Sequence, residues 1–144
     1  MILYLDTSAL VKLYIEETGF NIVRELVNTA DIVATSKISY VEASAAFVRN
    51  REENAISEKN YHQVIRDFKA DWDTCYTIEI SESILYLAGD LTDIHKIKAL
   101  DAIHLASSLI LSRRLQDQVV FACWDARLWK AAKKEGFEVA PDKI

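Results

Sequence analysis

The chain has 144 residues, of which 51% are hydrophobic and 27% charged, with only three Gly and one Pro. This length suits one domain with a sizeable core, and so little Gly and Pro argues against linkers and low-complexity sequence. The formal net charge of −5 argues against a protein that holds nucleic acid through its overall field, although local basic patches remain compatible with it.

Features of the sequence also limit where the protein works. No apolar run approaches the ~20 residues that a membrane helix needs. The N-terminus lacks the basic region of a signal peptide. Cys75 and Cys123 lie far apart and match no metal-ligand spacing. We therefore expect a cytoplasmic protein with reduced thiols and no membrane partner, in which Cys123 is buried.

The first predicted element is a strand at Ile2–Leu5, an apolar run without helical spacing. Such a run is typical of a strand that is buried on both faces. It ends at Asp6-Thr7-Ser8, and a short helix is expected at Ala9–Tyr14. A carboxylate at the carboxyl end of a buried parallel strand lies where open α/β sheets build their sites.

Beyond this start, stretches with helical spacing alternate with short apolar runs. Helices are predicted at about residues 19–29, from Ser39 to about Arg51, from Ser57 through Phe68, at Glu82–His95, at Leu100–Leu111 and at Asp125–Glu135. Strands are predicted at Asp31–Thr35, Tyr76–Ile80, Gln118–Cys123 and Phe137–Ala140. This alternation implies right-handed crossovers, and so an α/β fold: a three-layer α/β/α sandwich with a central parallel sheet of four to five strands, in a single domain 1–144.

Four acidic residues stand at the ends of predicted strands or the starts of predicted helices. They are Asp6, Glu42, Asp101 and Asp125. In a doubly wound sheet, all four of these positions can face one edge. Carboxylates converging there would repel one another unless a divalent cation held them, and Mg²⁺ prefers oxygen ligands. Such a site activates water for in-line attack on a phosphodiester.

Two of the acids also have a simple structural explanation as helix N-caps. Asp is among the best capping residues, and both Asp6 and Asp125 precede a predicted helix. Thr7 or Ser8 could cap the first helix equally well, so the cap does not require Asp6. On local sequence alone, the capping and functional interpretations of both acids stay open.

A purely structural role is easier to assign to Glu42 than to Asp101. Ser39-x-x-Glu42 matches a capping box, in which the glutamate reaches back to the helix start. Asp101 lies in the first turn of a nearly apolar helix, close to the expected core. A charge there is costly unless it is capped, paired or bound to metal, although the helix N-terminus offsets part of the cost. A functional role is therefore favoured for Asp101.

Four segments carry these acids in a fixed order. They are Leu5-Asp6-Thr7-Ser8-Ala9-Leu10-Val11-Lys12, Ser39-x-x-Glu42-x-x-x-Ala46-Phe47, Leu100-Asp101-Ala102-Ile103-His104-Leu105-Ala106, and Asp125-x-x-Leu128-x-x-Ala131-Ala132-x-x-x-Gly136-Phe137-x-Val139. As an ordered set that runs nearly end to end, they resemble the PIN-domain family, and within it the VapC-type toxins of prokaryotic type II toxin–antitoxin pairs. The third segment is the most specific.

The resemblance implies a Mg²⁺-dependent endoribonuclease that hydrolyses RNA phosphodiester bonds and acts as the toxin of a toxin–antitoxin pair. Asp6 and Asp101 would be the main Mg²⁺ ligands, with Mn²⁺ able to substitute. Glu42 and Asp125 would complete the catalytic pocket by positioning a second ion or the attacking water. Thr7 would orient the first carboxylate or a metal-bound water. The implied partners are an RNA substrate, a cognate antitoxin protein and a second copy in a homodimer.

One position departs from the family pattern. Cys123 stands two residues before the fourth acid, where the family often has Ser or Thr, and Trp124 makes the adjoining wall bulkier. Both bear on the role of Asp125. His104 could share a helix face with Asp101 and act as a general base, although the family has this histidine in a structural signature.

Two other functions are compatible with parts of the pattern. A catalytically degenerate PIN module would bind RNA or protein without cleavage, but all four acids are present. A phosphoacceptor receiver domain shares the parallel α/β architecture. That class usually has paired acids at the first strand and a Lys after a late strand. This chain has Leu3-Tyr4-Leu5 before Asp6, and Trp124 after Cys123.

Overall fold

The computed structural model describes all residues, 1–144, and contains one sheet of five strands. The strands are β1 (Ile2–Leu5), β2 (Ile32–Ser36), β3 (Tyr76–Ile78), β4 (Val119–Ala122) and β5 (Glu138–Ala140). Their order is β3-β2-β1-β4-β5, and every neighbouring pair is parallel. β1 is central and all four of its residues are buried, as its continuous apolar run predicts for a strand covered on both faces.

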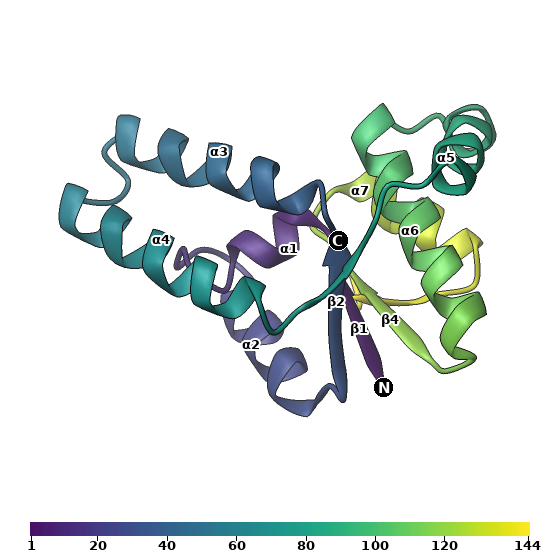
Figure 1. Cartoon of the computed structure of the whole chain (residues 1–144), viewed down its shortest axis with the longest axis horizontal. Helices are drawn as coiled ribbons and strands as arrows, with labels where there is room; N and C mark the ends of the chain where they lie inside the picture. Colours follow the sequence, from purple (N-terminus) through teal and green to yellow (C-terminus); the bar gives the residue numbers. More distant parts are fainter.

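Helices cover both faces of the sheet. They are α1 (Thr7–Val11), α2 (Phe20–Thr29), α3 (Ser39–Glu52), α4 (Glu58–Trp72), α5 (Glu82–His95), α6 (Ala99–Leu115) and α7 (Ala126–Lys134). Figure 1 shows α1–α4 on one side of the sheet and α5–α7 on the other. The predicted three-layer α/β/α sandwich with a parallel sheet is therefore confirmed.

The side chains of β1 alternate between two separate cores, because successive residues of a strand point to opposite faces. Leu3 and Leu5 pack with residues of α1–α4, whereas Ile2 and Tyr4 pack with residues of α5–α7. α3 and α4 form a helical hairpin, and Figure 1 shows them extending together away from the sheet. None of the helices combines the length and the apolar character that crossing a membrane would require.

Several element boundaries differ from the prediction, most of them by one residue and a few by two or more. The first helix occupies Thr7–Val11 and not Ala9–Tyr14. β3 ends at Ile78, two residues early. α6 continues past Leu111 to Leu115 through a polar last turn, which apolar spacing cannot mark. The first difference matters most, because α1 begins directly after the first acid and fixes that side chain at the sheet edge.

Candidate active site

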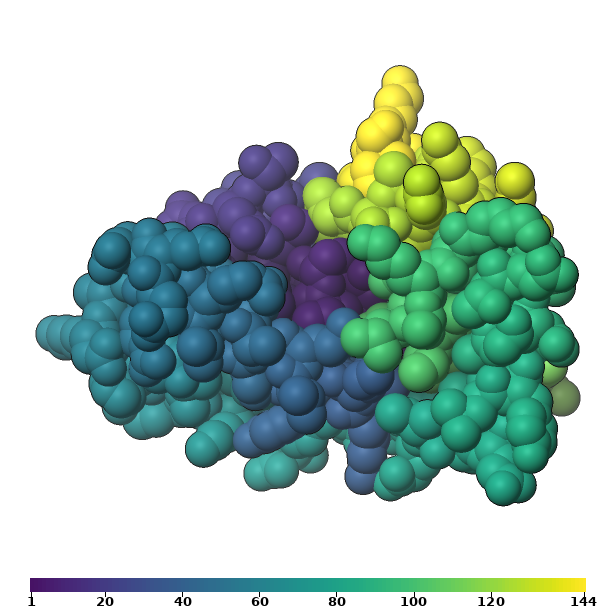
Figure 2. Space-filling view, turned by 90° about the horizontal axis from the view of Figure 1, so that it is seen from above, coloured from purple at the N-terminus to yellow at the C-terminus, as the bar shows by residue number.

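The four predicted acids lie on four different elements around the carboxyl ends of β1 and β4. Asp6 follows β1, Glu42 and Asp101 stand in the first turns of α3 and α6, and Asp125 precedes α7. The chain passes from β1 to β2 and β3 on one side, then crosses to β4 and β5 on the other side of β1. This reversal of the strand order opens a crevice at the carboxyl edge. Figure 2 looks onto this edge and shows the start of the chain, in dark purple, at the floor of a hollow ringed by blue, green and yellow-green segments.

Asp6 is the most deeply buried of the four acids, at 4% exposed. Its Oδ1 accepts hydrogen bonds from the Ala9 backbone N–H (2.9 Å) and the Ser8 hydroxyl (2.7 Å). Burial raises the pKa of Asp6 to about 6, and the charge of Asp101 adds to the rise. Asp6 is therefore the N-cap of α1, and the suggestion that Thr7 or Ser8 could replace it is wrong. The capping bond uses Oδ1, and the Ser8 hydroxyl also reaches Oδ2 at 2.9 Å. The charge of Asp101 acts on the same carboxylate.

Glu42 does not belong to a capping box. The Ser39 hydroxyl bonds instead to the hydroxyl of Thr35 (2.7 Å), and α3 has no side-chain N-cap bond. Oε1 of Glu42 accepts from the Thr7 hydroxyl (2.7 Å) and pairs with Nε2 of His104 at 2.9 Å. Burial disfavours the ionised form, but these two hydrogen bonds outweigh it and lower the pKa of Glu42. The carboxylate thus stays ionised and faces the other acids.

A buried histidine supports this arrangement. His104 is 2% exposed, and its Nδ1 lies 2.9 Å from the Tyr4 hydroxyl. Burial raises the pKa of Tyr4 far above its usual range, so its hydroxyl keeps the proton. The ionised Glu42 carboxylate can only accept, so Nε2–H donates to it, and the Thr7 hydroxyl lies 3.2 Å from Nε2. The spacing from Asp101 marked His104, but nothing local marked Tyr4, which looked like an ordinary residue of a buried strand.

Asp101 has no structural partner. The N-cap of α6 is Lys98, which makes no side-chain capping bond, and the Asp101 carboxylate takes part in no hydrogen bond or ion pair. Burial raises the pKa of Asp101, and the charges of Asp125 and Glu42 raise it further. A half-buried carboxylate that neighbouring acids repel is a cost to folding that neither a cap nor an ion pair offsets.

Asp125 combines the capping and functional positions. Its Oδ1 accepts from the Leu128 backbone N–H (2.9 Å), so the capping explanation holds for this acid. Its charge nevertheless reaches Asp101 and raises the pKa there. The buried Cys123 thiol lies 3.7 Å from the backbone oxygen of Asp125. The structure therefore brings all four predicted acids to one edge, with Thr7 between Glu42 and His104.

Trp124, which precedes Asp125, is held in place by contacts with residues of α1 and of the segment that follows it. The Trp124 backbone N–H donates to the Ser8 hydroxyl (2.9 Å), which itself bonds to Asp6. The Lys12 ammonium lies 4.8 Å from the Trp124 ring centroid. Gly19 approaches the indole so closely that a Cβ there would lie 2.5 Å from Cζ2. Trp124 thus ties the wall of the site to the segment between α1 and α2.

The oxygen donors suit a hard divalent cation. As placed, no three Asp, Glu, His or Cys side chains form a complete metal-binding group. Mg²⁺ does not require one, because it usually binds one or two carboxylates and keeps several waters. Asp101 without a partner and Asp6 with a raised pKa are carboxylates that a cation would stabilise. Their chemistry therefore fits the predicted ligand pair.

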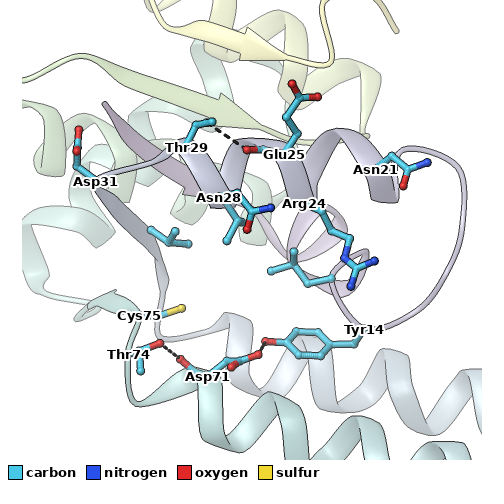
Figure 3. Close-up of a pocket in the computed structure, with 13 residues that line it drawn as sticks. Tyr14, Asn21, Arg24, Glu25, Asn28, Thr29, Asp31, Asp71, Thr74 and Cys75 are labelled. Carbon is cyan, nitrogen blue, oxygen red and sulfur yellow. Dashed lines mark hydrogen bonds between the residues drawn. The ribbon is translucent and has the colours of Figure 1, made fainter.

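The largest cavity of the protein lies away from the acids. It measures about 810 Å³ and lies between α2, the end of α4 and the amino end of β2. Figure 3 shows Tyr14 and Asp71 meeting across it, with the tyrosine hydroxyl donating to the carboxylate at 2.9 Å. Its charged side chains carry both signs, among them Arg24 and Glu25. None of the four acids lines this cavity.

Comparison with known proteins agrees with this architecture. Residues 3–115 match the model of the PIN domain family. The chain is 31% identical over 143 residues to Ribonuclease VapC45 of Mycobacterium tuberculosis, covering 99% of this chain and 97% of the relative. The structure of VapBC-1 from nontypeable Haemophilus influenzae aligns with a TM-score of 0.65 at 20% identity, covering 96% of both chains. VapC20 of M. tuberculosis, a sarcin–ricin loop cleaving toxin, aligns with a TM-score of 0.65 at 16% identity, covering 96% of this chain and 99% of that one.

Proposed function

Because the chain belongs to the PIN-domain family, and within it to the VapC ribonucleases, we propose that it is a divalent-metal-dependent endoribonuclease and the toxin of a toxin–antitoxin pair. The observation that carries the proposal is the unpartnered, half-buried Asp101 beside Asp6, Glu42 and Asp125. A structural role would have given this carboxylate a cap or a cation. A binding site for Mg²⁺ explains why an acid stays there without one.

Each of the four acids has its own role in the proposed reaction. Asp6 and Asp101 would hold Mg²⁺, with Mn²⁺ able to substitute. The bound ion would supply an activated water and stabilise the leaving oxygen. Glu42, kept ionised by His104 and Thr7, accepts a proton from the attacking water or orients it. Asp125 completes the acidic wall on the β4 side.

The same proposal extends to the whole chain and its partners. The nuclease domain spans residues 1–144, because the proposed site includes Asp125, which lies beyond the matched residues 3–115. We place its activity in the cytoplasm. RNA is the substrate, as the name of the relative suggests. Several similar structures are toxin–antitoxin complexes, so a cognate antitoxin is the expected inhibitor. A homodimer is the expected assembly.

Cleavage of total cellular RNA by the purified, antitoxin-free protein tests this proposal. Discrete products should form with Mg²⁺ or Mn²⁺ and disappear with EDTA. Asp101→Asn should fold normally and cut nothing, because Asp101 supports no other side chain. Full activity of this variant would refute the assignment. A folded wild-type protein that neither cleaves RNA nor binds Mn²⁺ would point to a degenerate binding module.

A further inference from the structure

A groove leads out of the acidic site between α1 and α3. Its volume is about 450 Å³, and Thr7 and Glu42 line the end that it shares with the site. Arg49 and Asn50 line the other end. Arg49 is seven residues after Glu42 on the same helix, so the groove runs about 10 Å along α3. Anything that follows the groove from the acids must therefore pass Arg49.

Arg49 is the uncompensated cation of this groove. It is exposed and takes part in no ion pair, whereas Lys12 on the opposite wall is buried and pairs with Glu17 at 2.9 Å. Its neighbour Arg51 behaves differently, because it pairs with glutamates and lies 4.2 Å from the Tyr61 ring. The charge of Arg51 is therefore used in contacts within the helical hairpin, whereas the charge of Arg49 has no such partner.

The shape of the groove suits a polymer backbone. Its α3 wall contains Ala45 and Ala46 between the acid and the arginine, so this side of the path is lined by short side chains. On the α1 side, Thr7 and Ser8 line the groove with their hydroxyl protons donated to Glu42 and Asp6, and the carboxylate of Glu17 is paired with Lys12. In a protein whose net charge is −5, a polyanion needs a local cation to approach four carboxylates. The guanidinium of Arg49, which takes part in no ion pair, meets that need.

We propose that this groove holds the phosphodiester backbone of single-stranded RNA next to the scissile bond, and that Arg49 binds one of its phosphates. This inference rests on the proposed function and adds the path of the substrate. Guanidinium groups bind phosphate oxygens in a bidentate manner. Arg49 is then a substrate-positioning residue, separate from the residues that act on the scissile phosphate.

The test measures RNA binding apart from cleavage. In an Asp101→Asn background, a fluorescently labelled single-stranded RNA of mixed sequence is titrated at several salt concentrations. Each phosphate contact to a single strand contributes about 0.7 to the slope of log K against log salt. Arg49→Ala should lower that slope by about 0.7, which weakens binding about eightfold at ~50 mM salt relative to 1 M. Arg49→Lys should keep the slope, because an ammonium still neutralises a phosphate.

The matched control is Arg114→Ala, an exposed arginine in the last turn of α6, away from the groove. In the cleaving protein, Arg49→Ala should raise KM with kcat unchanged, and Arg114→Ala should change neither. Equal slopes for the two alanine variants would overturn the inference while leaving the nuclease assignment intact. Normal RNA binding by Arg49→Ala with loss of antitoxin binding would assign the groove to a peptide. Absence of cleavage by the wild type would refute the proposed function instead.

Discussion

Nε2 of His104 lies 2.9 Å from Oε1 of Glu42, so a buried histidine on α6 holds an acid on α3. The other ring nitrogen is fixed by Tyr4 of the central strand at 2.9 Å. The three side chains link β1, α6 and α3, which come from three separate parts of the chain. Because both ring nitrogens are engaged, the imidazole cannot rotate without breaking a buried hydrogen bond. The orientation of Glu42 thus depends on a residue in the core.

The role of His104 can be separated from its contribution to packing by two substitutions. The amide of His104→Gln can reach Glu42 from the position of Nε2, whereas the amide of His104→Asn lies near Nδ1 and is too short. We expect kcat for RNA cleavage to fall roughly 10- to 100-fold in His104→Asn and only a few-fold in His104→Gln, with KM unchanged. Thermal melts establish that both variants fold. Equal losses in both would assign His104 to packing alone.

Asp6→Asn should stabilise the metal-free protein at neutral pH. The folded pKa of Asp6, about 6, lies above the ordinary value of 3.8, so the folded state binds more protons between these two pH values. Wild-type stability therefore falls as pH rises through this window, while Asn does not titrate and still caps α1. The gain should reach up to about 3 kcal/mol at pH 7 and vanish near pH 4. Urea unfolding in EDTA measures it, and equal destabilisation at both pH values would contradict the prediction.

The affinity for metal should depend on the same titration. A cation that binds Asp6 must displace its proton below pH about 6. The association constant for Mn²⁺ should be nearly constant above that pH and fall by up to about tenfold per pH unit below it. Isothermal titration calorimetry between pH 5 and 8 provides the measurement. A constant affinity across this range would exclude Asp6 as a ligand.

Gly19→Ala should destabilise the protein more than Gly136→Ala. Both glycines have left-handed backbone conformations, with φ of +94° and +93°. A Cβ at Gly19 would also lie 2.5 Å from Trp124, whereas a Cβ at Gly136 meets nothing within 4 Å. We expect about 1–2 kcal/mol from the backbone term in both variants, and a further 1–3 kcal/mol from overpacking at Gly19 alone. Chemical denaturation compares them, and equal losses would show that Trp124 moves freely.

Much of the fold follows from local pattern. The apolar run of β1, the helical spacing along Glu82–His95 and the glycine that ends α7 are properties of neighbouring residues, and the structure has them where the sequence predicts. The parallel sheet follows from the alternation of strands and helices, because a crossover must return to the same edge. The same rule explains why four acids at element junctions could be expected to converge.

The hydrogen-bond partners of each acid could not be predicted from local sequence pattern. Ser39 and Glu42 have the spacing of a capping box, yet Glu42 turns to Thr7 and His104, which lie 35 and 62 residues away along the chain. Asp125 caps α7, one of the two interpretations that its local sequence left open, whereas Asp101 has no hydrogen-bond partner. Sequence determined which elements form and that their acids share one edge, because these depend on periodicity and topology. Only tertiary structure decided which carboxylate is bonded and which stays free, because hydrogen bonds across elements depend on strand register and helix packing to within an ångström.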